Sequence, residues 1–244
     1  MANVIVVGAG PAGIMAALSS AKNNEVVLIE RNSNIGEKLK LTGGGRCNIT
    51  NNRDIEEFFE KIVTNNKFLY SALYTFSNYS LLEYFSEQGL EYKEELDQKV
   101  YTKSDKADEV IEVLKNDLKN NNVKIMFNTK IEDLIVEDNT VKGVISEGGK
   151  RIYGDKVIVT TGGKSFPNTG SDGSMYDVIK KYGHTITPIY PALIPLVIKE
   201  EFVKSLQGVS MKDVVISAKV KKRKIEKIGD MIFTHFGVSG PGVL

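Results

Sequence analysis

Short apolar runs alternate with polar breaks along the first thirty residues. Residues 3–7 (NVIVV) form one run, and residues 26–30 (VVLIE) form a second. Between them, the small residues of IMAALSSA follow a helical pattern. The order predicts a strand, a helix and a second strand, the repeating unit of α/β folds.

The same reading extends along most of the chain. Apolar spacing predicts helices over residues 54–88, with a break and a new helix start at 77–80. Further elements are expected in this order: a strand or hairpin at 90–101, an amphipathic helix from 104–107 to 118, a parallel strand at 123–127, a three-stranded β-meander over 131–153, a buried strand at 156–161 and an amphipathic helix over 174–182.

A cluster of prolines at 188, 191 and 195 marks a change in composition. Beyond it, strands are expected at 193–198, 214–220 and 231–233, with a basic hairpin tip at 219–227. We therefore predict an α/β fold with two parts. Residues 1–190 form a Rossmann-like α/β domain with a β-meander, and residues 191–244 form part of a β-rich domain.

Composition and charge exclude several classes of function. Of the 244 residues, 32 are Lys or Arg and 31 are Asp or Glu, so the formal charge of +1 provides no electrostatic footprint for nucleic acid. No apolar stretch has the length of a membrane span, and the N-terminus lacks a signal-peptide pattern. One cysteine and two distant histidines form no disulfide framework and no recognisable zinc pattern. These features predict a cytoplasmic protein without a metal, a membrane or a nucleic acid as partner.

The turn after the first strand carries the strongest chemical signal. Gly8 permits a tight turn, Gly10 lets the backbone approach a pyrophosphate, and Gly13 lets the helix pack closely on the strand. The helix N-terminus offers free N–H groups to phosphates. Glu30, about 20 residues further on, can accept hydrogen bonds from ribose hydroxyls. The alternative is a glycine turn that binds nothing.

Two further glycine-rich segments follow strand ends. The loop TGGGRCNITN at 42–51 exposes backbone N–H groups. Its Arg46 could pair with a phosphate, and its Cys47 is either a redox thiol or, as we favour, a small packing residue beside the cofactor. The segment TTGGKS at 160–165 directly follows the expected buried strand. Taken alone it is equally compatible with an ordinary turn.

Four motifs occur in one order: GAGPAG at 8–13, TGGGRCNITN at 42–51, TTGGKSFPNTGSDG at 160–173 and FTHFGVSGP at 233–241. In this respect the chain resembles the family of flavoproteins that includes aminoacetone oxidases and bile-acid 7-dehydroxylation reductases. The resemblance implies a glutathione-reductase-like fold with two dinucleotide-binding domains, FAD as cofactor, and NAD(P)H as a candidate electron donor.

The resemblance also implies which residues bind the cofactor. The ADP half of FAD would lie on the first turn and on Glu30, with Ile131 beside the adenine. Lys38 and the second loop would lie along the pyrophosphate and flavin, and the third motif would flank the cofactor from the far side. The full predicted set is Gly8, Gly10, Pro11, Ala12, Gly13, Glu30, Arg31, Lys38, Gly44, Arg46, Cys47, Asn48, Ile131, Thr161, Gly162 and Gly163.

Two departures from the family pattern affect what is expected. Residues 98–102 (QKVYT) replace a Gly-Arg-Val-Phe-Pro-like segment, which weakens a substrate assignment based on it. Family chains are also longer and return from the inserted β domain to a closing FAD-binding segment. We therefore expect that segment to be missing here and the affinity for FAD to be reduced.

The sequence leads to one main hypothesis and two alternatives. The main hypothesis is an FAD-dependent oxidoreductase that transfers hydride to or from a small organic molecule, such as an amine or an enone-like steroid. The first alternative is an FAD- or NAD-binding fragment without turnover. The second is a nicotinamide-dependent dehydrogenase on a simple Rossmann fold. No catalytic acid or base is assigned.

Overall fold

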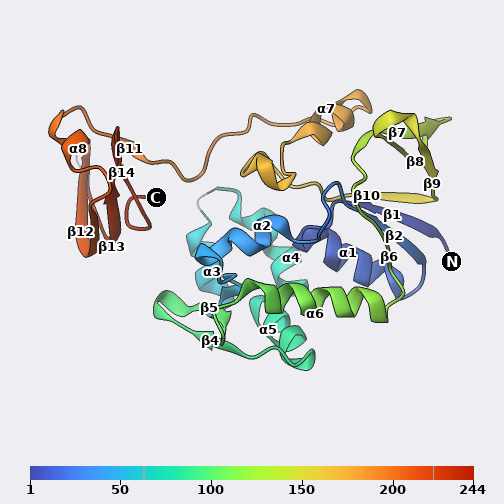
Figure 1. The fold of residues 1–244 in the computed structure, drawn as a ribbon, viewed down its shortest axis with the longest axis horizontal. Coiled ribbons are helices and arrows are strands. Elements are labelled where there is room, and N and C mark those ends of the chain that lie inside the picture. The colour runs from blue at the N-terminus through green and yellow to red at the C-terminus, as the bar shows by residue number, and fades with distance from the viewer. Residues whose placement is uncertain (63, 222) are drawn as a thin grey trace. The chain divides into compact units, whose positions relative to one another are not determined.

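The computed structural model describes residues 1–62, 64–221 and 223–244, and the chain divides into two units, Met1–Thr185 and Ile186–Leu244 (Figure 1). Residues 63 and 222 lie outside the described residues. The first belongs to the expected helical stretch and the second to the expected basic hairpin tip. The predicted domain limits, 1–190 and 191–244, stay a prediction. Each unit is described separately below.

A parallel sheet forms the centre of the first unit. Its strand order is β10-β1-β2-β6, and each neighbouring pair is parallel. Val7 lies beside both Ile29 and Val159, so three strands end level with one another. The four expected strands are therefore confirmed, with these bounds: β1 (Asn3–Val7), β2 (Glu25–Ile29), β6 (Lys124–Met126) and β10 (Lys156–Val159). The strand β10 is half-buried rather than buried.

The continuous apolar run of β1 reflects burial on both faces of the sheet. Val4 and Val6 pack on one face with the helices α1 (Pro11–Ala21) and α6 (Ala107–Asn120). Ile5 and Val7 face the opposite side, where the β-meander and α7 (Ser174–Lys181) supply the packing partners. Because successive side chains of a strand alternate between faces, one pentapeptide contributes to two cores.

The β-meander is an antiparallel sheet of order β7-β8-β9. Its bounds are β7 (Ile131–Glu137), β8 (Thr140–Ser146) and β9 (Arg151–Tyr153). Lys181 and Tyr182, at the end of α7, both bond to Asp133 on β7, at 2.8 and 3.1 Å. These bonds tie α7 to the meander. The structure confirms the meander and the helix expected from the sequence.

Residues 37–102 form short elements beside the sheet. The helical stretch expected at 54–88 is interrupted, and α5 starts where the Ser77 side chain accepts a hydrogen bond from the Ser80 N–H. The bounds are α2 (Glu37–Leu41), β3 (Thr50–Asn51), α3 (Ile55–Lys61), α4 (Tyr70–Thr75), α5 (Asn78–Glu87), β4 (Tyr92–Glu94) and β5 (Lys99–Thr102), with β3-β5-β4 as an antiparallel sheet. Short 3-10 turns are η1 (Thr42–Gly44), η2 (Asn66–Leu69), η3 (Leu96–Gln98), η4 (Glu147–Gly149) and η5 (Pro167–Thr169).

The second unit is built on an antiparallel sheet of order β11-β14-β13-β12. Its elements are β11 (Leu196–Val197), α8 (Phe202–Ser205), β12 (Ser210–Val220), β13 (Arg223–Phe233) and β14 (Gly237–Ser239). The expected strands at 193–198, 214–220 and 231–233 all fall on this sheet, although β11 is shorter than expected and β13 longer.

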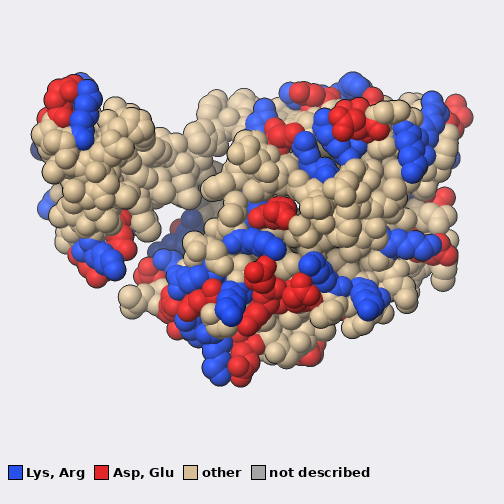
Figure 2. Space-filling model, in the orientation of Figure 1, with Lys and Arg blue, Asp and Glu red and all other residues tan. Residues whose placement is uncertain are grey.

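The surface carries both signs of charge. Figure 2 shows Lys and Arg side chains interspersed with Asp and Glu side chains on the visible face of the first unit. This mixing agrees with the near-balanced charge of the sequence. Among the described residues, no helix is long and apolar enough to cross a membrane.

Candidate functional site

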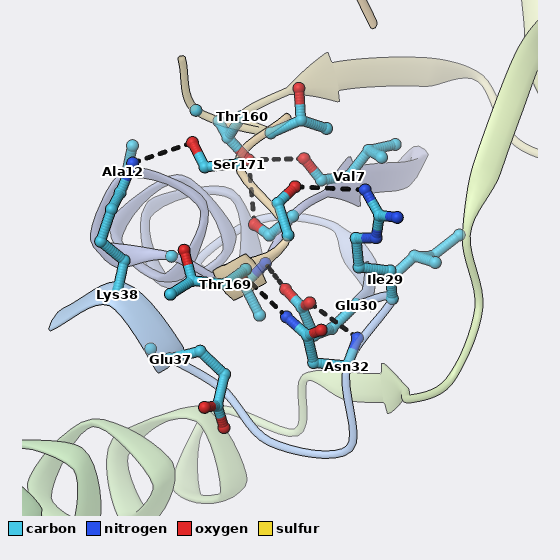
Figure 3. A pocket seen from close by; sticks show the side chains of 18 of the residues that line it. Val7, Ala12, Ile29, Glu30, Asn32, Glu37, Lys38, Thr160, Thr169 and Ser171 are labelled. Atoms are coloured by element: carbon cyan, nitrogen blue, oxygen red, sulfur yellow. Dashed lines mark hydrogen bonds between the residues drawn. The ribbon is translucent and has the colours of Figure 1, made fainter. Parts of the chain in front are cut away.

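A cavity lies at the carboxyl ends of β1, β2 and β10, the edge of a parallel sheet where α/β proteins bind ligands (Figure 3). Its walls come from segments that are far apart in the sequence, because parallel strands bring their ends to one edge. The lining residues are 7–12, 29–32, 36–39, 129–131, 160–162 and 169–171, together with Ser174 and Met175.

The three glycines of the first turn have different surroundings. A Cβ on Gly8 would lie 2.7 Å from the carbonyl oxygen of Thr160, and a Cβ on Gly13 would collide with the carbonyl oxygen of Gly8. A Cβ on Gly10 would have no described atom within 4 Å. Packing within the protein therefore explains Gly8 and Gly13. The open space above Gly10 suits a ligand that must approach the backbone closely.

The helix α1 begins at this turn with Gly10 as its N-cap and Pro11 as its first residue. Among the described side chains, none caps this end of the helix. The N–H groups of the first turn, on Ala12 and Gly13, have no partner within the helix and carry the positive end of its dipole. A phosphate is the natural partner for such a terminus.

Glu30 follows β2 and is buried, with 7% of its surface exposed. One carboxylate oxygen accepts the Ala9 N–H at 2.7 Å, and the other accepts the Asn32 N–H at 2.9 Å. These bonds hold the carboxylate at the cavity wall, and each oxygen keeps a further lone pair. Glu30 is therefore placed to accept hydrogen bonds from the hydroxyls of a ribose.

Lys38 projects from α2 toward the opposite wall. Its Nζ donates to the Ser171 hydroxyl at 2.8 Å and lies 3.4 Å from both the hydroxyl and the carbonyl oxygen of Ser165. Within the described part of the chain, Lys38 forms no ion pair with a carboxylate. Its charge is held by neutral oxygens only, so it can still attract an anion.

Arg31 also lines the cavity, but its guanidinium is already paired. It donates to Asp172 at 2.6 Å and to the carbonyl oxygen of Gly170 at 3.3 Å. Burial alone would raise the pKa of Asp172, yet the bonds from Arg31 and from the Ser174 N–H outweigh it, and the pKa of this carboxyl is well below its ordinary value. The pair therefore stays charged at neutral pH.

The remaining predicted residues divide into two groups. Ile131, Thr161 and Gly162 line the cavity with residues 8–12 of the first turn, while Gly13 and Gly163 are not among the described lining residues. Gly44, Arg46, Cys47 and Asn48 are not among the described residues that line it. The cofactor-binding role given to each residue stays a prediction.

Arg46 is directed into a charged cluster beside the loop. Its guanidinium donates to both carboxylate oxygens of Glu95 at 3.0 Å and lies 3.4 Å from Asp105. The same group lies 4.0 Å from the centre of the Tyr101 ring, in a cation–π contact. The phosphate-pairing role suggested by the sequence therefore competes with four contacts made inside the protein, counting the bond from Nε to the Gly43 carbonyl oxygen.

Cys47 is fully buried. Burial raises the pKa of its thiol above the ordinary value, and a hydrogen bond with Thr42 lowers it by less. A buried thiol of raised pKa is a poor nucleophile. These surroundings favour the packing role over the redox role.

Asn48 donates weakly to the carbonyl oxygens of Thr50 and Val100, at 3.3 and 3.4 Å.

The sequence reasoning did not assign some of the lining. Asn32, Thr129, Lys130 and the segment 169–171 line the cavity without appearing in the predicted set. The glycine- and serine-rich run at 168–174 was the available signal, because it follows the strand end of β10 and precedes a helix.

The fold and the cavity define a Rossmann-like domain with its ligand site at the strand ends, which confirms the predicted fold class. The family described as "HI0933-like protein Rossmann domain" matches residues 2–235, and the chain belongs to this family.

Two curated proteins are similar over almost the whole chain. A 3-dehydro-bile acid delta(4,6)-reductase of Clostridium scindens is 33% identical over 98% of this chain and 58% of its own length. A ribosomal RNA dihydrouridine synthase of Haemophilus influenzae is 30% identical over 98% of this chain and 59% of its own length. The chain thus spans somewhat more than half the length of these relatives.

Among solved structures, the open conformation of a flavocytochrome c3 fumarate reductase superposes with a TM-score of 0.63. The identity is 18%, and the match covers 87% of this chain and 47% of that one. At this identity the likeness shows a shared fold.

Proposed function

We propose that the chain is the FAD-binding part of a flavin-dependent oxidoreductase. The observation that carries the proposal is the combination of open space above Gly10 with the buried carboxylate of Glu30 at one end of the same sheet. The first suits a pyrophosphate and the second suits a ribose, as in dinucleotide-binding folds. When bound, the flavin supplies the capacity to accept and donate hydride.

The residues of this chain provide binding and orientation. The N-terminus of α1 and the Lys38 ammonium would offset the negative charge of the two phosphates. Glu30 would orient the adenosine ribose through its hydroxyls, and Ile131 would contact the adenine. The backbone at 161–162 would close the far side.

The names of the two curated relatives suggest a substrate class. A 3-oxo compound with delta-4,6 double bonds and a uracil ring share a carbon–carbon double bond conjugated with a carbonyl group. We therefore propose an activated alkene as substrate. In the net reaction, NAD(P)H and one proton supply two hydrogens to the double bond, and NAD(P)+ leaves.

A small steroid-like enone is the first candidate, because the near-balanced charge of the chain provides no electrostatic footprint for RNA. A uridine within RNA is the second, because one relative bears that name. This second candidate would overturn the prediction of no nucleic-acid partner. A cytoplasmic location also stays a prediction.

The visible absorption spectrum of the purified chain, after addition of FAD and desalting, tests the proposal first. We expect a retained flavin band. Its anaerobic bleaching by NADH or NADPH, followed by reoxidation with an enone, an amine or a uridine-containing RNA, would identify the donor and the acceptor. Retained flavin without reduction would favour a binding fragment. Tight NADH binding without any retained flavin would favour the nicotinamide-dependent dehydrogenase instead.

A further inference from the structure

Part of the cavity wall comes from a segment that has no strand pairing with the described rest of the unit. Residues 163–173, called the strap here, connect the end of β10 to the start of α7, and residues 169–171 of the strap line the cavity. Its backbone bonds run from Thr169 to Phe166 and from Gly170 to Pro167. Among the described residues, no backbone hydrogen bond joins 163–172 to the sheet or to residues 29–41.

Three side chains that follow β2 hold the strap across the cavity. Arg31 pairs with Asp172 at 2.6 Å. Asn32 donates to the carbonyl oxygen of Thr169 at 3.0 Å, and Lys38 donates to Ser171 at 2.8 Å (Figure 3). All three donors lie within eight positions of one another in the sequence, on the wall that also carries Glu30. Among the described residues, side-chain bonds and no backbone hydrogen bonds therefore join the strap to the segment that follows β2.

The ion pair is the one of these three bonds in which both partners are charged. Its two side chains are 31% and 34% exposed, and the guanidinium also reaches the carbonyl oxygen of Gly170. Charged hydrogen bonds are about twice as strong as neutral ones. Gly162 precedes the strap and Gly173 is its last residue, and their φ angles are 77° and 76°. Glycine adopts and leaves such positive φ angles at low energetic cost.

We propose that the strap is a movable cover of the cavity and that Asp172 is the positioning residue that latches it through Arg31. The inference rests on the proposed function, since the ligand that the cover would retain is the dinucleotide. A long ligand enters only when the strap opens, so the latch sets the rate of cofactor exchange. Asp172 itself contacts Arg31 and the Ser174 N–H, and it acts on the ligand through the strap.

The substitution Asp172→Asn tests the latch. It removes the charge and keeps an oxygen that can accept the Ser174 N–H. Asp177→Asn is the matched control, because Asp177 forms an exposed i,i+3 pair with Lys180 on α7 and is not among the described lining residues. After dilution of the FAD-loaded chain, the rise of flavin fluorescence reports release. We expect Asp172→Asn to release FAD about five to ten times faster and the control to match the parent.

Hydrogen exchange of the chain without FAD provides a readout independent of the cofactor. In Asp172→Asn, amides of 163–173 should exchange faster, while those of β1 and α1 should be unchanged. Asp172→Glu should restore part of the protection, since it restores the charge. If the chain binds no FAD, the proposed function fails and exchange still decides whether the strap is latched. Release and exchange equal to the Asp177→Asn control would overturn the inference and leave FAD binding untouched.

Discussion

Two glycine-rich loops of the first unit contain similar residues for different physical reasons. In the turn at 8–13, Gly13 is required by contact, because a Cβ there would enter the Gly8 carbonyl oxygen. In the loop at 42–45, Gly44 and Gly45 have no described atom within 4 Å of a Cβ, and their φ angles are 69° and 92°. In the first turn, close contact with backbone explains Gly13 and, together with a φ of 101°, Gly8, whereas Gly10 borders open space. In the second loop, the left-handed backbone explains Gly44 and Gly45.

The polar residues near each loop also differ. The first turn has an uncapped helix end, within the described residues, and a carboxylate at a cavity wall. The second is followed by Arg46, whose guanidinium is already paired with Glu95, Asp105 and Tyr101 of the same chain. The comparison teaches that glycine content alone does not identify a ligand site. The candidate site is distinguished by the polar groups that border the glycines, here a helix end and a buried carboxylate.

The largest effect is expected from Gly13→Ala. The added methyl would overlap backbone and force α1 away from β1, so we expect a loss of about 3 kcal/mol or more in the free energy of unfolding. Chemical denaturation followed by circular dichroism measures it. A midpoint equal to that of the parent chain would mean that the close contact between helix and strand is dispensable.

A smaller but more specific effect is expected from Gly10→Ala. The φ and ψ angles of Gly10, −77° and 177°, suit alanine, so stability should change by about 0.5 kcal/mol or less. The methyl would occupy the space proposed for the pyrophosphate, and the affinity for FAD should fall about tenfold or more, or about 1.4 kcal/mol. Titration of the apo chain with FAD provides the measurement. Unchanged affinity would place the ligand elsewhere.

The substitution Arg46→Gln tests whether Arg46 of the second loop has a structural role or pairs with a phosphate. If Arg46 mainly holds its loop to the β4–β5 hairpin, losing partly exposed ion pairs should cost about 1 kcal/mol of stability. FAD affinity should then change by about twofold or less. Thermal unfolding and FAD titration on the same samples separate the two roles. A large loss of affinity at unchanged stability would support phosphate pairing instead.

The smallest effect on the native chain is expected from a thiol reagent, because Cys47 should react with it only slowly. Burial raises the pKa of the Cys47 thiol, which lowers the thiolate fraction at neutral pH, and the sulfur is enclosed. Labelling at neutral pH should be on the order of a hundredfold slower than in urea, since it requires local opening. Equal rates in both solvents would revive a reactive role for Cys47.

Much of the fold follows from local patterns. The apolar runs at 3–7 and 26–30, the helix between them and the later meander were predictable because each repeats the period of its own secondary structure. The turn at 8–13 and Glu30 were also predictable, since their spacing follows from one strand–helix–strand unit. The interruptions within 54–88 were predicted only in part, because capping by Ser77 is local whereas the lengths of α3 and α4 depend on packing.

By itself the sequence determined the class of fold and the part of the site that lies within one β–α–β unit, because period and turn chemistry act between near neighbours. The folded structure was needed to show which distant residues pair. Lys38 meets Ser171 and Arg31 meets Asp172 beside the cavity, and Arg46 meets Glu95 outside its lining, across 133, 141 and 49 positions. Such pairings depend on where strand ends and loops come together in space, which the periodicity of the sequence does not encode.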